Sequence, residues 1–413
     1  MDSGTFKKLV EEYICPILTG SKSGKQITAS EKSDIVTIQS GRRTLHIRPS
    51  KSSSYKIELT RPQPFYSSDK TIVTSILNEI LSHYNKVDEQ YRQRIINYGV
   101  EVGICRYIAG PHYQILFDII NALDKWAIRT YEGRKVTFSI TIDFARVDVP
   151  DTKSPSIIEI MEEDFSALLS NNVESSLYVS SKGALLGYKN LTESTQNVSY
   201  SPERFHAFAS SASEEKIAIT LTTNGEILIF QHKTLIFSKR RGIWNYFNHE
   251  PVMKRIAGSS KYTEPTATKA IYETILDVSF ARTGGCIGFI RSTDVKKMIE
   301  RKVIKDEDII SKGKSIKSQT LKRLINGKKF QQLNRTLRKE ILAIDGATIV
   351  DFDGNIIAAG AIIQIKAGST GGGRLAATKT LAEYGTAIKI SADGMVRGYK
   401  QIDNEATETF FFG

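Results

Sequence analysis

Two short segments near the C-terminal end of the chain carry residue types that could act on a nucleoside triphosphate. The first is Asp345-Gly346-Ala347, in which one carboxylate stands beside two residues without bulk. The second is a glycine-rich run that ends in Thr370-Gly371-Gly372-Gly373 and is followed by Arg374, at the predicted start of a helix. A carboxylate can hold a metal ion or a hydroxyl group, and free backbone N–H groups at a helix N-terminus can hold phosphate. Together the two segments predict a nucleotidyltransferase-like site.

Each of these features has a functional and a plainer interpretation. In the functional one, Asp345 binds metal, and the small residues after it let a base or ribose approach the backbone closely. Arg374 offers a forked pair of donors that matches phosphate oxygens, and Asp393 is a second acidic residue for metal. In the plainer one, Asp-Gly-Ala is a turn into a strand, the glycine run is a flexible loop, and Asp393 before Gly394 is a turn aspartate.

The glycine-rich run is not a P-loop, although Gly368 and Gly373 have the spacing of its two glycines. Arg374 stands where a P-loop has its lysine, and Leu375 stands where it has the serine or threonine that binds magnesium. The six histidines and three cysteines show no metal-ligand spacing. The cysteines are therefore expected to be buried apolar residues in a reducing compartment.

Composition and charge limit the classes of protein that the chain can belong to. The 413 residues are enough for two or three domains, and 40% hydrophobic with 25% charged residues is ordinary for a globular protein. We find no long apolar run and no signal peptide, so we expect a cytoplasmic protein without membrane insertion. The net charge is +12, and residues 291–339 hold 16 basic against 5 acidic side chains. This stretch favours a polyanion as ligand, such as a triphosphate, a nucleotide product or a nucleic acid, unless it is a solvated basic face.

Hydrophobic periodicity and turn signals predict the elements that must position these residues. We expect helices between residues 69 and 130, with breaks at Gly99, Gly110 and Pro111, and a hairpin whose turn is Asn224-Gly225. After residue 250 the pattern alternates helices and strands: a helix opened by Glu264-Pro265, a buried strand Cys286–Ile290, strands Ala347–Val350 and Ile356–Ile365, a helix Leu375–Glu383 and a strand Ala387–Ile390. The acidic tail after Lys400 is expected to fray unless its three terminal phenylalanines dock.

This pattern predicts an α/β protein with three parts. Residues 1–130 are a mostly helical sensor or regulatory region, and residues 131–250 are an α+β linker domain with a strand meander. Residues 251–413 form a mixed-sheet domain that carries the candidate site.

The order of motifs in residues 255–400 resembles the diadenylate cyclase (DisA-N) domain family. A long helix is followed by "ARTGGCIGFI", a helical stretch, "AIDGATIVDFDGNIIAAGAIIQI" and a glycine-rich segment into "RLAAT". The resemblance implies that two ATP molecules held by facing subunits are joined, each 3′-hydroxyl attacking the other's α-phosphate. It also implies Mg²⁺ or Mn²⁺, a homodimer or higher oligomer, Asp345 as metal or hydroxyl ligand, and Gly346 and Ala347 beside the base.

One motif departs from that family. Its Arg-His-Arg-Ala-Ala aligns with Gly373-Arg374-Leu375-Ala376-Ala377, so Arg374 stands in the place of the histidine and both flanking arginines are absent. Lys366 or Lys379 is expected to supply a second phosphate contact. The departure leaves several functions open: a cyclic di-AMP-like product from ATP or dATP, short linear adenylate or deoxyadenylate oligonucleotides, or a catalytically inactive nucleotide-binding sensor. A plain nucleic-acid-binding protein is a further alternative.

The segment ahead of this domain resembles the sensor modules fused to such cyclases in bacterial defence systems. The sequences "YEGRKVTFSITID" and "SKRRGIWNYF" carry that likeness. It implies that the N-terminal region senses a signal, that the product acts in anti-phage signalling, and that a nucleotide-gated effector protein is a partner.

Overall fold

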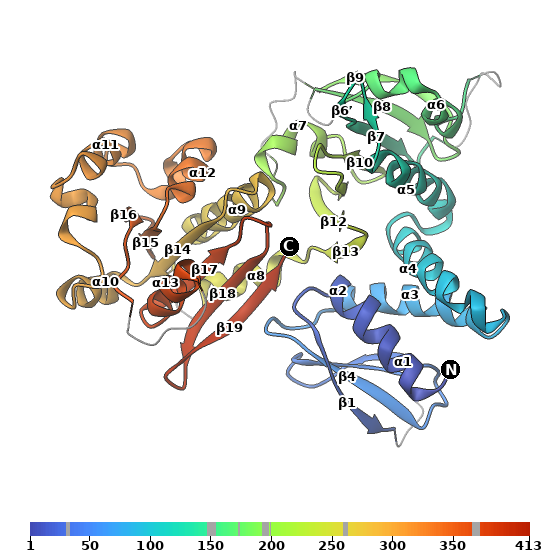
Figure 1. Cartoon of the computed structure of the whole chain (residues 1–413), viewed down its shortest axis with the longest axis horizontal. Coiled ribbons are helices and arrows are strands. Elements are labelled where there is room, and N and C mark those ends of the chain that lie inside the picture. The colour runs from blue at the N-terminus through green and yellow to red at the C-terminus, as the bar shows by residue number, and fades with distance from the viewer. Residues whose placement is uncertain are drawn as a thin grey trace. The chain divides into compact units, whose positions relative to one another are not determined.

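The computed structural model describes residues 1–29, 34–146, 154–171, 174–191, 198, 200–258, 263–365 and 372–413 (Figure 1). The chain divides into two compact units, unit 1 (Met1–Phe247) and unit 2 (Asn248–Gly413). With 43% helix and 28% strand in mixed sheets, the predicted α/β class is confirmed. The three-part division, with boundaries at 130 and 250, and the diadenylate-cyclase-like arrangement stay predictions.

Unit 1 begins with a short helical segment and a four-stranded antiparallel sheet of order β1-β4-β3-β2. The side chains of Leu45, Ile47, Ile57 and Leu59 on β3 and β4 are fully buried, as expected for a sheet with one face in a core. The elements are α1 (Ser3–Leu9), a π-helical turn (Val10–Ile14), α2 (Cys15–Ile17), β1 (Lys22–Thr28), β2 (Val36–Ile38), β3 (Thr44–Ile47) and β4 (Tyr55–Thr60).

Three helices follow, α3 (Ser67–Tyr84), α4 (Arg92–Ala109) and α5 (Tyr113–Ala127), as predicted for this stretch. The break expected at Gly99 is wrong, because this glycine lies inside α4 and packs against α3. A Cβ atom at Gly99 would lie 2.6 Å from Cγ1 of Ile80. The glycine therefore permits a close approach of two helices and does not end one.

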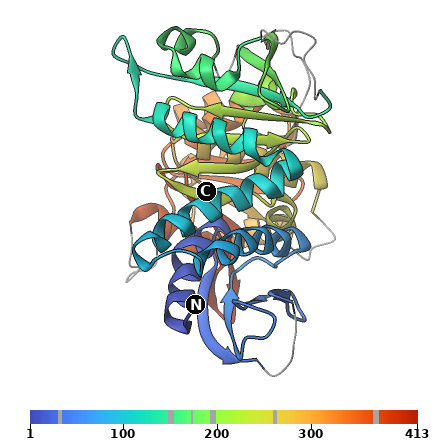
Figure 2. The ribbon, with the colours of Figure 1, turned by 90° about the vertical axis from the view of Figure 1, so that its right-hand side faces the viewer.

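The second part of unit 1 is a seven-stranded sheet of order β13-β12-β11-β10-β7-β8-β9, in which β7 and β8 are parallel and joined through α6. The Asn224-Gly225 hairpin is confirmed, with φ of 72° at Gly225. Figure 2 shows α4 and α5, in cyan to teal, in front of these strands. The elements are β7 (Phe138–Asp143), α6 (Ile157–Glu162), β8 (Ser175–Ser180), β9 (Leu185–Asn190), α7 (His206–Ala209), β10 (Lys216–Leu221), β11 (Ile227–Gln231), β12 (Thr234–Arg240) and β13 (Ile243–Tyr246), and β5 (Thr130–Tyr131) pairs with β6 (Arg134–Lys135).

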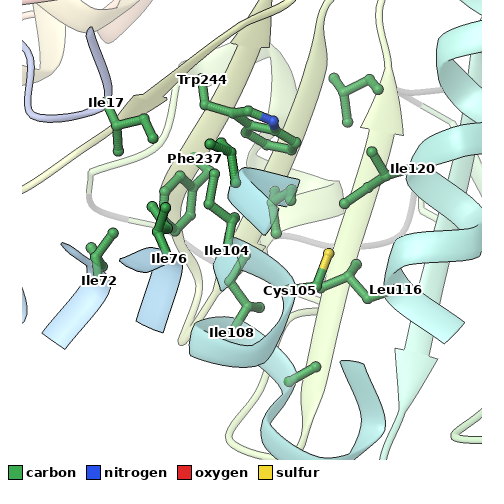
Figure 3. Close-up of a cluster of buried hydrophobic side chains, with 14 of the residues drawn as sticks. Ile17, Ile72, Ile76, Ile104, Cys105, Ile108, Leu116, Ile120, Phe237 and Trp244 are labelled. Carbon is green, nitrogen blue, oxygen red and sulfur yellow. The ribbon is translucent and has the colours of Figure 1, made fainter. Parts of the chain in front are cut away.

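One hydrophobic core holds unit 1 together. In Figure 3, Ile17 of α2, Ile76 of α3 and Ile104 of α4 converge with Phe237 of β12 and Trp244 of β13. All five side chains are at most 4% exposed. The residues before and after position 130 therefore share a core.

Unit 2 is built on a six-stranded mixed sheet of order β16-β15-β14-β17-β18-β19. The strands β14 and β15 are parallel, and every other neighbouring pair is antiparallel. All residues of β14 are buried, as its apolar sequence predicts. The strands are β14 (Gly285–Ile290), β15 (Ala347–Asp351), β16 (Ile356–Ala361), β17 (Gly385–Ile390), β18 (Val396–Ile402) and β19 (Glu405–Phe412).

Helices cover both faces of this sheet (Figure 1). On one face, Thr378 of α13 (Gly373–Ala382) lies 3.3 Å from the thiol of Cys286. On the other, Leu342 of α12 (Arg335–Ala343) lies over Gly285, and α12 packs against α9 (Pro265–Ala281). The remaining helices are α8 (His249–Ala257), α10 (Ser292–Glu300) and α11 (Ile316–Ile325).

The C-terminal tail is an ordered hairpin, and the expected fraying is replaced by docking of its rings. Phe410 is fully buried, and Phe411 and Phe412 are 9% and 4% exposed. The ring of Phe412 lies 6.0 Å from that of Tyr272 on α9. The apolar end of β19 thus belongs to the core of unit 2.

Candidate functional site

One edge of the unit 2 sheet collects most of the residues that the sequence singled out. The parallel strands β14 and β15 begin there, while their antiparallel neighbours β17 and β16 end there, since Gly285 pairs with Ile390 and Ala347 with Ala361. Asp345 lies two residues before the first residue of β15, so we call this the Asp345 edge. Neighbouring strands lie about 4.8 Å apart, so residues at this edge are within reach of a single small ligand.

Asp345 is exposed and lies between the end of α12 and the start of β15. Its carboxylate makes no hydrogen bond or ion pair with the part of the chain that the structure describes. Both oxygens are therefore available as acceptors for a metal ion or a hydroxyl group. Ala347, by contrast, is fully buried in the core beneath α13.

The backbone of Gly346 is covered by the chain itself. Its φ is 111°, and a Cβ atom there would lie 2.5 Å from the carbonyl carbon of Gly360. Gly360 also has a positive φ, of 59°. Packing of one glycine on the other gives a structural reason for the residue type at position 346, and the expected role of Gly346 and Ala347 beside a base stays a prediction.

Arg374 lies in the first turn of α13 and extends toward the start of β14. Its Nη1 atom would lie 2.6 Å from a Cβ atom placed on Gly284, which has φ of 71° and precedes β14. The guanidinium group is half-buried and forms no hydrogen bond or ion pair with the described residues. Arg374 therefore reaches the Asp345 edge, one strand away from Asp345.

The glycines before Arg374 are described in part. Thr370 and Gly371 lie outside the described residues, whereas Gly372 is the N-cap of α13 and Gly373 its first residue. Both are exposed, and a Cβ atom on either would have open space around it. The N-terminus of α13 therefore presents free backbone N–H groups and the positive end of a ten-residue helix.

The charge of Arg374 also influences the pKa of Cys286, which lies beneath α13. Burial raises the pKa of the Cys286 thiol to about 11, against the opposing effects of the Thr378 hydroxyl and the Arg374 guanidinium. Cys286 is therefore a protonated thiol in the core at neutral pH.

Asp393 lies in the turn between β17 and β18. Its Oδ1 accepts a hydrogen bond from the backbone N–H of Met395 at 3.2 Å, as in a turn aspartate. Burial lowers the pKa of the nearby Arg282 guanidinium, and the charge of Asp393 partly offsets that effect. The strand β14 separates Asp393 from Asp345, so the two carboxylates lie on either side of Gly284. Metal binding by Asp393 stays a prediction.

Sequence reasoning missed Lys317, the second residue of α11. Its Nζ donates to the carbonyl oxygen of Gly360 at 2.6 Å and lies 2.6 Å from Oδ1 of Asp308. Because Gly360 packs on Gly346, this ammonium group is on the β16 side of Asp345. No local signal distinguishes Lys317 from the other lysines of the basic stretch, since its place depends on a contact 43 residues away in sequence.

The two lysines expected to replace the absent arginines are placed differently. Lys366 lies outside the described residues. Lys379 is five residues beyond Arg374, roughly 7.5 Å farther along α13 and away from the Asp345 edge.

Comparison with models of known protein families finds no match, and comparison with curated proteins finds none either. Among the residues that the structure describes, no group of three or more histidine, cysteine, aspartate or glutamate side chains could hold a metal ion. Within the same residues, no helix combines the length and apolarity needed to cross a membrane.

Proposed function

We propose that unit 2 is a nucleotidyltransferase that joins ATP or dATP molecules by attack of a 3′-hydroxyl group on an α-phosphate. The observation that carries the proposal is the pairing, at one sheet edge, of an unpartnered carboxylate with an unpartnered guanidinium. The side chains of Asp345 and Arg374 have no hydrogen-bond or ion-pair partner among the described residues, and they lie at the starts of the adjacent strands β15 and β14. Because the two charged groups do not pair with each other, the guanidinium can bind phosphate while the carboxylate binds a metal ion on the same ligand.

The residues would act mainly by binding and orientation. Arg374 and the N-terminus of α13 bind triphosphate oxygens, and Asp345 orients the 3′-hydroxyl group. Each joining step forms one bond between O3′ and the α-phosphorus and breaks the bond from that phosphorus to the bridging oxygen. Pyrophosphate leaves, and the hydroxyl proton passes to solvent.

The carboxylate of Asp345 fits a hard divalent cation. Mg²⁺ is commonly bound by one or two carboxylates together with phosphate oxygens of the substrate, so one free carboxylate is sufficient. Bound Mg²⁺ or Mn²⁺ would neutralise charge on the phosphates during transfer. Asp345 would hold it, and Asp393, beyond β14 and β17 in the sheet order, is the second acidic residue predicted for metal.

The wider context belongs to the same proposal. A homodimer or higher oligomer would bring two nucleotides face to face and give a cyclic di-AMP-like messenger. Unit 1 would sense the activating signal, and a nucleotide-gated effector protein would respond to the product in an antiviral defence system of the cytoplasm. A linear adenylate or deoxyadenylate oligonucleotide is the alternative product, and a nucleotide-binding sensor without turnover is the alternative function.

The test compares two aspartates at opposite ends of β15. Purified full-length protein is incubated with each labelled ribo- and deoxyribonucleoside triphosphate and Mg²⁺ or Mn²⁺, and products are separated by chromatography and mass. Asp345→Asn is run beside Asp353→Asn, since Asp353 is also exposed but lies in the turn beyond the far end of the strand. We expect product from wild type and from Asp353→Asn, and none from Asp345→Asn.

Each other result has a definite meaning. A linear product that depends on Asp345 selects the alternative product. Tight nucleotide binding without pyrophosphate release selects the sensor. Product formed equally by both aspartate variants would remove Asp345 from the mechanism and defeat the proposal.

A further inference from the structure

Lys317 and Asp308 form an ion pair whose environment is unusual for this part of the chain. Asp308 is 4% exposed, and its two oxygens are both engaged: Oδ1 by Lys317 at 2.6 Å and Oδ2 by the backbone N–H of Ile362 at 3.2 Å. Other lysines of the basic stretch, such as Lys296 and Lys322, are exposed. The buried carboxylate thus fixes one lysine of many in a single orientation.

The ammonium group of Lys317 keeps donor capacity after these contacts. It has three N–H donors, of which one points at Asp308 and one at the carbonyl oxygen of Gly360, also at 2.6 Å. Its side chain is 35% exposed, so the third donor can reach solvent or a ligand. Lys317 also lies in the first turn of α11, whose positive end adds to the attraction for an anion.

The position of Lys317 mirrors that of Arg374 across Asp345. The Gly360 carbonyl oxygen that it binds would lie 2.8 Å from a Cβ atom on Gly346, directly after Asp345. Arg374 lies over Gly284, on the β14 side of Asp345. Two cations from separate helices, α11 and α13, therefore lie next to the backbone on the two sides of Asp345, where an extended chain of phosphates could contact both.

We propose that Lys317, oriented by Asp308, binds phosphate at the Asp345 edge as a second cation beside Arg374. This inference rests on the proposed function for the identity of the ligand, a nucleoside triphosphate. Lys317 supplies a charge for binding, and Asp308 is a positioning residue that acts through it.

The competing explanation is that Lys317 only ties α11 to the end of β16. The test therefore measures equilibrium binding of inorganic tripolyphosphate and of a non-hydrolysable ATP analogue by calorimetry, with thermal unfolding followed by far-UV circular dichroism. Four variants of the full chain are compared. Lys317→Met removes the charge, Lys317→Arg keeps it, Asp308→Asn loosens its orientation, and Lys322→Met removes an exposed charge from the same helix.

We expect Lys317→Met to weaken binding of both probes by roughly tenfold or more, as for loss of a charged hydrogen bond. Lys317→Arg should stay within about threefold of wild type, Asp308→Asn should weaken binding less than Lys317→Met, and Lys322→Met should have no effect. Binding is measured well below the melting temperature of every variant. If Lys317 has only a structural role, Lys317→Met will lower the melting temperature and leave the affinity for both probes unchanged. Unchanged affinity in Lys317→Met overturns the inference.

The results separate this inference from the proposed function. If wild type makes product and Lys317→Met binds both probes as tightly, the inference fails and the proposed function stands. If tripolyphosphate binding depends on Lys317 but no nucleotide is ever joined, the inference stands and the proposed function fails. Wild-type protein that binds neither probe defeats both.

Discussion

Gly346 lies against Gly360 so closely that neither residue has room for a side chain. A Cβ atom on Gly346 would be 2.5 Å from the carbonyl carbon of Gly360, and one on Gly360 would be 2.4 Å from Cγ2 of Ile344. This contact brings the end of β16 across the start of β15, and with it the carbonyl oxygen that Lys317 binds. The two glycines therefore set the spacing between Asp345 and its neighbouring cation.

Replacing Gly346 with alanine should destabilise unit 2 strongly. The new methyl group would overlap the Gly360 backbone, and a non-glycine residue at φ of 111° is strained. Overpacking and left-handed strain together suggest a loss of about 3 kcal/mol. Gly373→Ala is the matched control and should change stability by less than about 0.5 kcal/mol, because its Cβ atom meets open space. Urea unfolding followed by far-UV circular dichroism measures both, and equal stabilities would contradict the packing argument.

The buried pair of Arg335 and Asp277 should be the strongest polar contact between α12 and α9. Nε and Nη2 of the arginine donate to the two carboxylate oxygens at 2.6 Å and 3.0 Å, and the residues are 9% and 4% exposed. Asp277→Asn leaves the buried guanidinium with only the more distant carboxylate of Glu273, 4.0 Å from Nη1, as counter-charge, so we expect a loss of about 3 kcal/mol. The double variant Asp277→Leu with Arg335→Met should recover most of that loss. A double-mutant cycle of Asp277→Leu, Arg335→Met and the double variant, measured by urea unfolding, tests the coupling; losses that simply add would contradict it.

The thiols of the native protein should be inert. All three cysteines are free and buried, and burial raises the pKa of Cys286 to about 11 and that of Cys15 to about 12. At pH 8 a thiol with a pKa near 11 is only about one part in a thousand thiolate, the reactive form. Alkylation followed by mass spectrometry should show no adduct in native protein within the time that modifies all three thiols in urea. Rapid modification of Cys286 would mean that the α13 face of the sheet opens readily.

Local signals predicted much of the fold, and the exceptions have physical causes. The Asn224-Gly225 hairpin and the apolar strand Cys286–Ile290 can each be recognised from a few adjacent residues. The β18–β19 hairpin was missed because its second strand is acidic, although its two-residue turn, Asp403-Asn404, has φ of 51° and 65°. Asp and Asn tolerate such angles better than most residues, so the turn signal was present but outweighed by composition.

The candidate site was predictable only in its separate parts. Asp345 and Arg374 were found from the short motifs that contain them, but only strand pairing brings them to one edge of the sheet. Lys317 and Asp308 carry no motif, because their significance comes from contacts with Gly360 and Ile362. Long-range register of this kind is absent from a single sequence.

Lys400 of β18 should make the stability of unit 2 depend on alkaline pH. Burial, reinforced by the nearby charge of Arg255, lowers the pKa of its ammonium group to about 8. It makes no hydrogen bond or ion pair within the described part of the chain. In the unfolded chain a lysine has a pKa of about 10.4, so between pH 8 and pH 10.4 the unfolded state binds more protons. This group alone therefore makes the free energy of unfolding rise with pH across that window. The destabilisation caused by burying its charge is fully present below pH 8.

Lys400→Met should remove this penalty. At pH 7 we expect the free energy of unfolding of unit 2 to increase by as much as about 3 kcal/mol, and the gain over wild type to shrink as pH approaches 10. Lys296→Met, at an exposed position on α10, is the control and should show neither effect. Far-UV circular dichroism during urea unfolding at pH 7 and pH 10 is the appropriate measurement, because both tryptophans, Trp126 and Trp244, lie in unit 1. A gain that is equal at the two pH values would show that the methionine stabilises by apolar packing and that the lysine is not charged against its surroundings at pH 7.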